Sequence, residues 1–190
     1  MQEQIPAQCE HRAFGKESVM ASVFECVRAR VEVREFKADP IPEPIIQKIL
    51  EAGRWSPSQR NRQPWHFIVI QQRDTLKQLG ALAASGPYLA DAPLAIAVVT
   101  EGARAPLIDG TRAISSMQLV AWEEGLGSCW IGSIDRAGVK QLLNLPDACE
   151  LITVLPFGYP TDAAKALRKR RKPLEQIAHR ERFGVPYRVT

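Results

Sequence analysis

Hydrophobic residues recur at helical spacing in some segments and form nearly continuous runs in others, and this contrast predicts a mixture of helices and strands. A first helix is expected over about 18–30, with apolar residues such as Val23 and Val27 on one face. The runs 94–99 and 151–157 are almost wholly apolar, which is typical of strands buried on both faces. Further helices are expected over 43–54, from about residue 74 to residue 85, after Asp109-Gly110 and after Asp135, and a further strand over 66–71.

A polar loop between two tryptophans, residues 55–65, separates the second predicted helix from the first predicted strand. Its two prolines, Pro57 and Pro64, disfavour helical backbone at the preceding residue, so the helix is expected to end here. Between the prolines stand neutral hydrogen-bonding side chains: Ser58, Gln59, Asn61 and Gln63. Two interpretations are open. These side chains either cap an ordinary turn, or they hydrogen-bond to the edge of a planar heterocycle. Neutral amides and hydroxyls can pair with both the C=O and the N–H groups of such an edge.

Basic residues gather in two places. Arg28 and Arg30 suit the negative end of the first predicted helix, but Arg34 stands in an extended, alternating stretch that this effect does not explain. The run 168–172 is either solvated surface or a site for a phosphate. A glycine-rich element follows the central helix, and a short apolar strand is expected to end at Gly132, where the missing Cβ lets the backbone approach a ring closely.

Length and composition suit one globular domain. The chain has 190 residues, 45% hydrophobic and 24% charged, and a net charge of +4 with a pI of about 9.0. The start has neither the basic nor the apolar part of a signal peptide, and no apolar run approaches the roughly 20 residues of a membrane helix. The four cysteines and three histidines are widely spaced, so we expect free thiols, a cytoplasmic location and no metal site. No Gly-x-Gly-x-x-Gly or Walker loop indicates a separate nucleotide-binding domain.

The order and spacing of four motifs resemble the nitroreductase family of flavoproteins. The motifs are Arg30-x-Glu32-x-Arg34-x-Phe36, Pro57-Ser58-x-x-Asn61-x-Gln63-Pro64-Trp65, Trp130-Ile131-Gly132-Ser133 and Phe157-Gly158-Tyr159-Pro160. The resemblance implies an α+β fold, a three-layer α/β/α sandwich whose central, mostly antiparallel sheet is flanked by helices, in a homodimer. Residues 18–190 would form a single FMN-binding domain with an extended C-terminal arm, and residues 1–17 an N-terminal extension.

The resemblance also implies roles for individual residues. Arg30 takes the place of an arginine that holds the FMN phosphate, and Arg34 that of a basic residue beside the pyrimidine end of the ring, where it would stabilise reduced flavin. Glu32 departs from the serine of most members; it would turn away from the phosphate, pair with Arg28 or Arg30, or serve chemistry. Gln118 is either a flavin or substrate contact or a solvated side chain. The other implied FMN contacts are Pro57, Ser58, Asn61, Trp130, Ile131, Gly132, Ser133, Lys169 and Arg171, with the amides of Gly132 and Ser133 facing flavin N5 and O4.

The function implied is that of an FMN-dependent oxidoreductase working by a ping-pong mechanism. NAD(P)H would dock transiently and pass hydride to flavin N5, and a small electron-poor acceptor such as a nitroaromatic or quinone would then enter the same cleft. We name no catalytic side chain, because the cofactor carries the chemistry. The alternatives are oxygen-dependent fragmentation of the flavin with Glu32 as the acid, and a non-enzymatic protein that binds flavin or nucleic acid. No nucleic-acid motif or aromatic platform accompanies residues 168–172.

Overall fold

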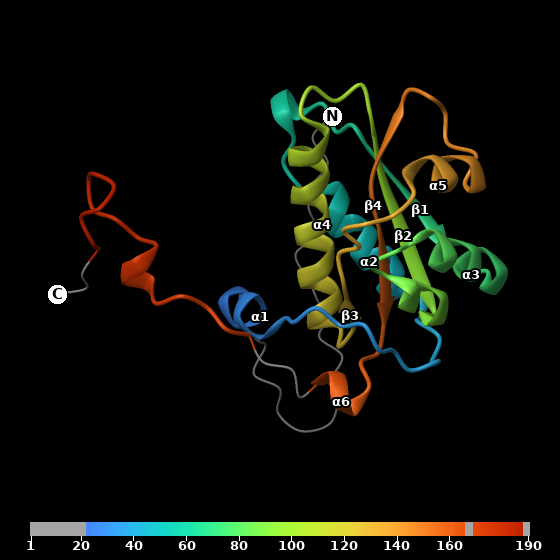
Figure 1. Ribbon diagram of the computed structural model, residues 1–190, viewed down its shortest axis with the longest axis horizontal. Coiled ribbons are helices and arrows are strands. Elements are labelled where there is room, and N and C mark those ends of the chain that lie inside the picture. Colours follow the sequence, from blue (N-terminus) through green and yellow to red (C-terminus); the bar gives the residue numbers. More distant parts are fainter. Residues whose placement is uncertain (1–21, 166–168, 188–190) are drawn as a thin grey trace, which may run out of the picture.

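The computed structural model describes residues 22–165 and 169–187, and these form a three-layer α/β/α sandwich with helices on both faces of a central sheet (Figure 1). The predicted fold class is therefore confirmed. The predicted N-terminal extension, residues 1–17, lies outside the described residues. Within the described residues, no helix is both long enough and apolar enough to cross a membrane.

The central sheet has four strands in the order β1-β2-β4-β3, and neighbouring strands run antiparallel. Seven consecutive residues of β2, from Leu94 to Thr100, are buried, as expected for a strand covered on both faces. The strand bounds are β1 Trp65–Ile70, β2 Leu94–Glu101, β3 Gly127–Ser128 and β4 Cys149–Gly158. The predicted strands at 66–71, 94–99 and 151–157 are thus confirmed with small shifts at their ends.

Each face of the sheet has its own hydrophobic core. Alternate side chains of β2 point in opposite directions, so Ile96 and Val98 enter one core and Ala97 and Val99 the other. The first core is covered by α2 (Glu43–Arg54) and α4 (Pro106–Glu123). The second is covered by α3 (Arg73–Leu82), the 3-10 helix η2 (Pro87–Asp91) and α5 (Arg136–Leu142), which Asp135 caps as predicted.

Three details differ from the predictions. The central helix begins at Pro106, four residues before Gly110, because proline is well tolerated in the first turn. The glycine-rich element forms a strand only over Gly127–Ser128, so Trp130 and Ile131 lie in irregular backbone. The first helix, α1 (Val23–Ala29), begins at a capping box of Ser22 and Glu25. Its apolar side chains are not buried in this single chain: Val23, Phe24 and Val27 are 77%, 71% and 50% exposed.

The C-terminal segment leaves the body of the domain. After α6 (Asp162–Lys165), residues 173–187 extend away from the sandwich (Figure 1), and we call them the arm. The arm contains the 3-10 helix η3 (Leu174–Gln176), and its hydrogen bonds run largely within itself, as from Tyr187 N–H to Ala178 O. Several of its apolar side chains are exposed, including Ile177 and Phe183.

Candidate active site

An extended segment beside β3 places three charged side chains on one face. Glu32 forms a parallel bridge with Ser128, and the Val33 amide donates to Ser128 O at 3.0 Å. Because side chains alternate along extended backbone, Val31 and Val33 are buried while Arg30, Glu32 and Arg34 face the other way. The approach is close enough that a Cβ on Gly127 would lie 2.5 Å from the Val33 side chain, so this position requires glycine.

Glu32 is held at both carboxylate oxygens. Oε1 accepts a hydrogen bond from Arg30 Nη1 at 2.6 Å, and Oε2 accepts one from the Trp130 amide at 3.0 Å. Burial raises the pKa of Glu32, but the hydrogen bond and charge of Arg30, together with the Trp130 amide, bring the pKa below its usual value. Of the three arrangements open for this residue, the structure therefore has the pair with Arg30, and Glu32 is ionised at neutral pH.

Lys169 and Arg171 reach the same place from the C-terminal segment. The Lys169 ammonium donates to Val27 O at 2.6 Å. Its pKa is lowered by burial and by the positive charges of Arg30 and Arg171, and Glu32 partly offsets this. We call Arg30, Lys169 and Arg171 the basic cluster. Three of the predicted phosphate contacts thus converge, although they come from opposite ends of the chain.

Arg34 lies against a tyrosine and a thiol. Tyr88 donates to Cys129 Sγ at 3.2 Å, and the neighbouring Cys129 and Tyr88 raise the pKa of Arg34 despite some desolvation. Burial and the Cys129 contact raise the pKa of Tyr88 to about 12, and burial raises that of Cys129. Arg34 is therefore a permanent cation beside two neutral groups, and Cys129 is a buried thiol without the lowered pKa of a reactive cysteine.

Gly132 and Ser133, predicted to present two amides to a ring, differ from each other. The Ser133 amide donates to Ser85 Oγ at 2.8 Å and the Ser85 amide donates to Ser133 O at 3.2 Å, so Ser133 is already engaged within the chain. A Cβ built on Gly132 meets no described atom within 4 Å, and the backbone there is not left-handed. Neither packing among the described residues nor backbone conformation requires glycine at this position, so the open space in front of it suits a closely approaching ligand.

Gln118 corrects an expectation. It is only 7% exposed, and its Nε2 donates to Ser128 Oγ at 3.1 Å. The expectation that Gln118 has a solvated side chain is therefore wrong. Gln118 holds Ser128 of β3 by this hydrogen bond, and Ser128 is the residue that forms the β-bridge with Glu32.

The polar loop is strained and fastened to α4. Arg60, Asn61 and Gln63 have positive φ angles of 55°, 54° and 51°, which non-glycine residues adopt at a cost and which are frequent at functional sites. The loop contains the 3-10 helix η1 (Gln59–Asn61), whose Gln59 amide donates to Asp109 Oδ1 at 3.0 Å; Asp109 is 1% exposed.

Within the loop, two predicted contacts already have partners. Ser58 Oγ accepts from the Gln63 amide at 2.8 Å, and Asn61 Oδ1 accepts from Gln63 Nε2 at 3.3 Å. Pro57 is exposed beside them. The turn interpretation therefore accounts for part of the role of Ser58. The Asn61 and Gln63 side chains are exposed and pair with each other through Gln63 Nε2 and Asn61 Oδ1, which leaves Asn61 Nδ2 and Gln63 Oε1 to meet a ligand.

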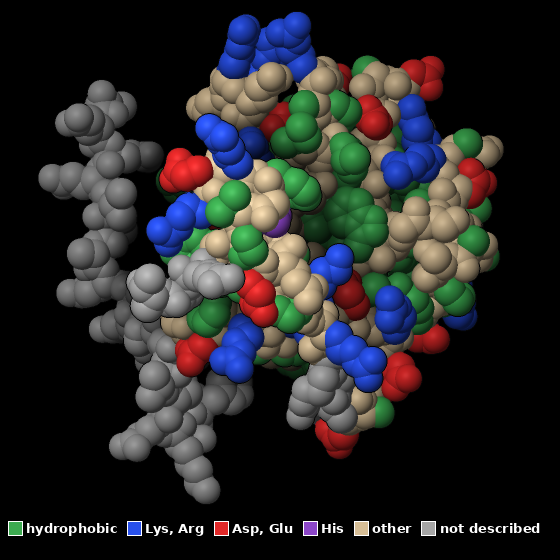
Figure 2. Space-filling view, turned by 60° about the vertical axis from the view of Figure 1, so that its left-hand side comes forward, with side chains coloured by type: hydrophobic (Ala, Val, Ile, Leu, Met, Phe, Trp, Pro, Cys, Tyr) green, Lys and Arg blue, Asp and Glu red, His purple; other side chains and the backbone are tan. Residues whose placement is uncertain are grey.

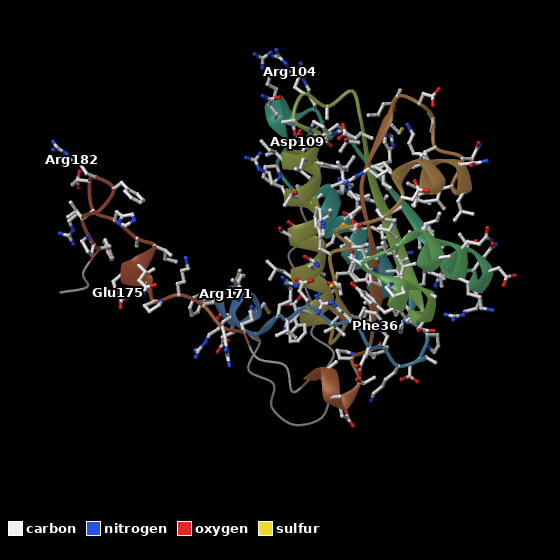
Figure 3. The ribbon with its side chains drawn as sticks, viewed as in Figure 1. Phe36, Arg104, Asp109, Arg171, Glu175 and Arg182 are labelled. Carbon is white, nitrogen blue, oxygen red and sulfur yellow. The ribbon has the colours of Figure 1, made fainter. Side chains whose placement is uncertain are left out.

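The two groups of predicted residues are held at different points along α4, the polar loop at Asp109 and the β3 edge at Gln118. Figure 3 shows Asp109, which holds the polar loop, near the N-terminal end of this helix, and Phe36 and Arg171 near the other end. Asp109 and Gln118 are nine residues, or about 13.5 Å, apart along this helix. The structure thus brings together Arg30, Glu32, Arg34, Trp130, Lys169 and Arg171, but not these residues with Pro57, Ser58 and Asn61.

Sequence reasoning missed three supporting residues. Ser85 holds Ser133, Tyr88 lies against Arg34 and Cys129, and buried Asp109 holds the loop. Only Asp109 had a usable signal, an acidic residue among apolar helix positions. Figure 2 shows a hydrophobic hollow on this face of the molecule, with both basic and acidic side chains around it.

These features define a class, an α+β sandwich with a basic site at the β3 edge of its sheet and a strained polar loop at the far end of its central helix. Comparison with known proteins makes the class more specific. The family model described as the nitroreductase family matches residues 27–110 and 86–159. The chain belongs to the nitroreductase family.

Individual relatives agree with this assignment. A Methanothermobacter thermautotrophicus protein, described provisionally as an NADH dehydrogenase/NAD(P)H nitroreductase, is 32% identical over 157 residues, covering 78% of this chain and 82% of that protein. A Bacteroides thetaiotaomicron structure with the same provisional description has a TM-score of 0.79 at 24% identity, over 85% of this chain and 98% of that one. The structure of an FMN-dependent nitroreductase from Clostridium difficile has a TM-score of 0.76 at 24% identity, over 83% and 98%. At that identity, the two structures bear on the fold alone.

Proposed function

We propose that the protein is an FMN-dependent NAD(P)H oxidoreductase that reduces a small electron-poor acceptor, with each flavin site shared between two copies of the chain. Family membership supports the reaction class, and a curated relative is described as acting with NAD(P)H. The observation that carries the proposal is the convergence at the β3 edge. There the basic cluster and Arg34 flank Glu32, whose carboxylate accepts from the amide of Trp130, two residues before Gly132.

This donor set fits FMN in chemistry. The flavin phosphate is close to dianionic, and the basic cluster offers two guanidinium groups and an ammonium as a complement. The ring is flat and apolar with polar edges. Gly132 has no side chain to keep such a ring away, and the uncharged amides of Asn61 and Gln63 match its mixed C=O and N–H edge.

The chain's own residues would bind and polarise rather than carry out acid–base steps. Bound FMN would supply the two-electron chemistry between NAD(P)H and the acceptor. Arg34 would place a permanent positive charge where negative charge develops on reduction, and Tyr88 and Cys129 are its neighbours in the chain's own fold. The Gly132 amide, which has no hydrogen-bond partner among the described residues, is a donor for the ring edge. Ser133 would first have to release Ser85 to do the same.

A second copy of the chain is the partner that completes the site. The half-sites are held at separate points along α4, so an antiparallel pair of chains related by a two-fold axis would bring the loop of one to the basic cluster of the other. Exposed apolar residues agree with such a pairing. They are Val23, Phe24 and Val27 of α1 and Leu174, Ile177 and Phe183 of the arm.

The geometry of Glu32 argues against flavin fragmentation. An acid must hold a proton to give, whereas the pKa of Glu32 is lowered and both of its oxygens accept hydrogen bonds. We therefore retain the reductase reaction and assign Glu32 no proton transfer.

The decisive experiment is complementation between two defective variants. Arg30→Ala removes a phosphate contact, and the Ser58→Ala, Asn61→Ala double variant removes loop contacts; each alone should bind FMN more weakly than wild type and oxidise NADH and NADPH more slowly at limiting FMN. Unfolding the two together and refolding should restore about a quarter of the sites, because half of randomly formed dimers are mixed and each has one intact site. The control is each variant refolded alone. No recovery in the mixture, or a monomer in sedimentation, would refute the shared site, and colourless wild-type protein that no flavin restores would refute the reaction.

A further inference from the structure

Glu32 introduces a negative charge into a site that otherwise suits a phosphate. Its carboxylate lies 2.6 Å from Arg30 Nη1, and its charge acts on Lys169 as well. The basic cluster has three positive charges, and Glu32 cancels one of them. This inference rests on the proposed function, since it concerns which flavin the site selects.

The carboxylate is fixed in place rather than free to swing into solvent. One oxygen is held by Arg30 and the other by the Trp130 amide, while the main chain of Glu32 is bridged to Ser128. A phosphate bound by Arg30 would therefore share that guanidinium with Glu32 and lie a few ångströms from its negative charge. At such separations, a unit charge facing a dianion in a partly solvated site changes affinity by about tenfold to a hundredfold.

We propose that Glu32 is a specificity residue that weakens the contribution of the flavin phosphate to binding, so that the site discriminates less strongly between FMN and unphosphorylated riboflavin than it would without this charge. The ring and ribityl contacts are common to both ligands, and only the phosphate meets Glu32. The charge of Glu32 thus changes the ratio of the two dissociation constants rather than both constants together.

The test is a titration of flavin-free protein with FMN and with riboflavin, followed by quenching of flavin fluorescence. Glu32→Gln removes the charge and keeps a carbonyl oxygen for the Trp130 amide, and Glu32→Ser removes both. The matched control is Glu35→Gln, the same change on the same segment at a carboxylate that accepts from Thr161 Oγ1 at 3.2 Å instead of from the basic cluster. Glu32 is partly exposed, so neither variant leaves a core cavity.

Both Glu32 variants should bind FMN about tenfold more tightly or better, and riboflavin within about threefold of wild type, while Glu35→Gln changes neither. Equal changes for the two flavins, or weaker FMN binding in both Glu32 variants, would overturn the specificity role and leave the proposed function standing. No binding of either flavin by any of these proteins, wild type included, would overturn both.

Discussion

The variant Gly132→Ala tests whether glycine is needed at this position for ligand binding or for folding. The added Cβ meets no described atom within 4 Å and the backbone there is not left-handed, so the folded chain has room for it. Alanine also lowers the entropy of the unfolded chain, and stability should stay unchanged or rise by about 0.4–1 kcal/mol. A methyl group inserted between packed surfaces typically costs about 1–3 kcal/mol. If a ring lies against Gly132, the flavin dissociation constant should therefore rise about 5- to 150-fold.

The measurements are thermal unfolding of the flavin-free protein and fluorescence titration with FMN. Gly53→Ala is the opposite control, because its Cβ would lie 2.7 Å from Phe67 Cζ and 3.0 Å from Met117 Sδ in the first core. That variant should lose stability while its folded fraction binds FMN normally. Unchanged affinity in Gly132→Ala would refute the placement of the ring. A fall in its unfolding temperature without flavin would mean that the glycine serves the fold instead.

Two further predictions concern Arg34 and Asp109. Arg34→Ala should slow flavin reduction in stopped-flow experiments more than it weakens FMN binding, since a cation at this place favours the reduced state; reduction at the wild-type rate would reject the role. Asp109→Ala leaves the Gln59 amide without its acceptor and should cost about 1–3 kcal/mol in chemical unfolding as well as loosening FMN binding. Asp109→Asn retains an oxygen acceptor and should lose less of both, and equal losses in the two variants would contradict this hydrogen bond as the cause.

Much of the fold could be predicted from hydrophobic patterning. The continuous apolar run at Leu94 to Val99 has no polar face, and the structure places it in the middle of the sheet with a core on each side. The helix over 43–54 was equally readable, since Ile46 and Ile49 share one buried face. The start of the central helix was misplaced, because the Asp109-Gly110 pair suggests a turn, yet the carboxylate is buried within the helix against Gln59.

The candidate site was predictable only in its residue types. Arg30 and Lys169 are separated by most of the chain, and no local pattern states that they meet; the resemblance to a family supplied that expectation, and the structure brings them together. Hydrophobic periodicity also predicted the wrong degree of burial for two residues. Gln118 lies off the apolar stripe but is buried because β3 packs over it, and Val23 is on the stripe but exposed in the single chain.

The central helix connects these observations, because it supports both half-sites. Asp109 near its start fixes the polar loop, and Gln118, nine residues or about 13.5 Å further along, fixes Ser128 at the β3 edge. The loop and the β3 edge are therefore held on one rigid element, at a spacing that a single chain cannot change. In the proposed dimer, an antiparallel pairing of two such helices would place the start of each beside the end of the other and generate two equivalent sites at once. Strain in the loop at Arg60, Asn61 and Gln63 is then understandable, since these residues would be shaped for a ligand held mainly by the partner chain.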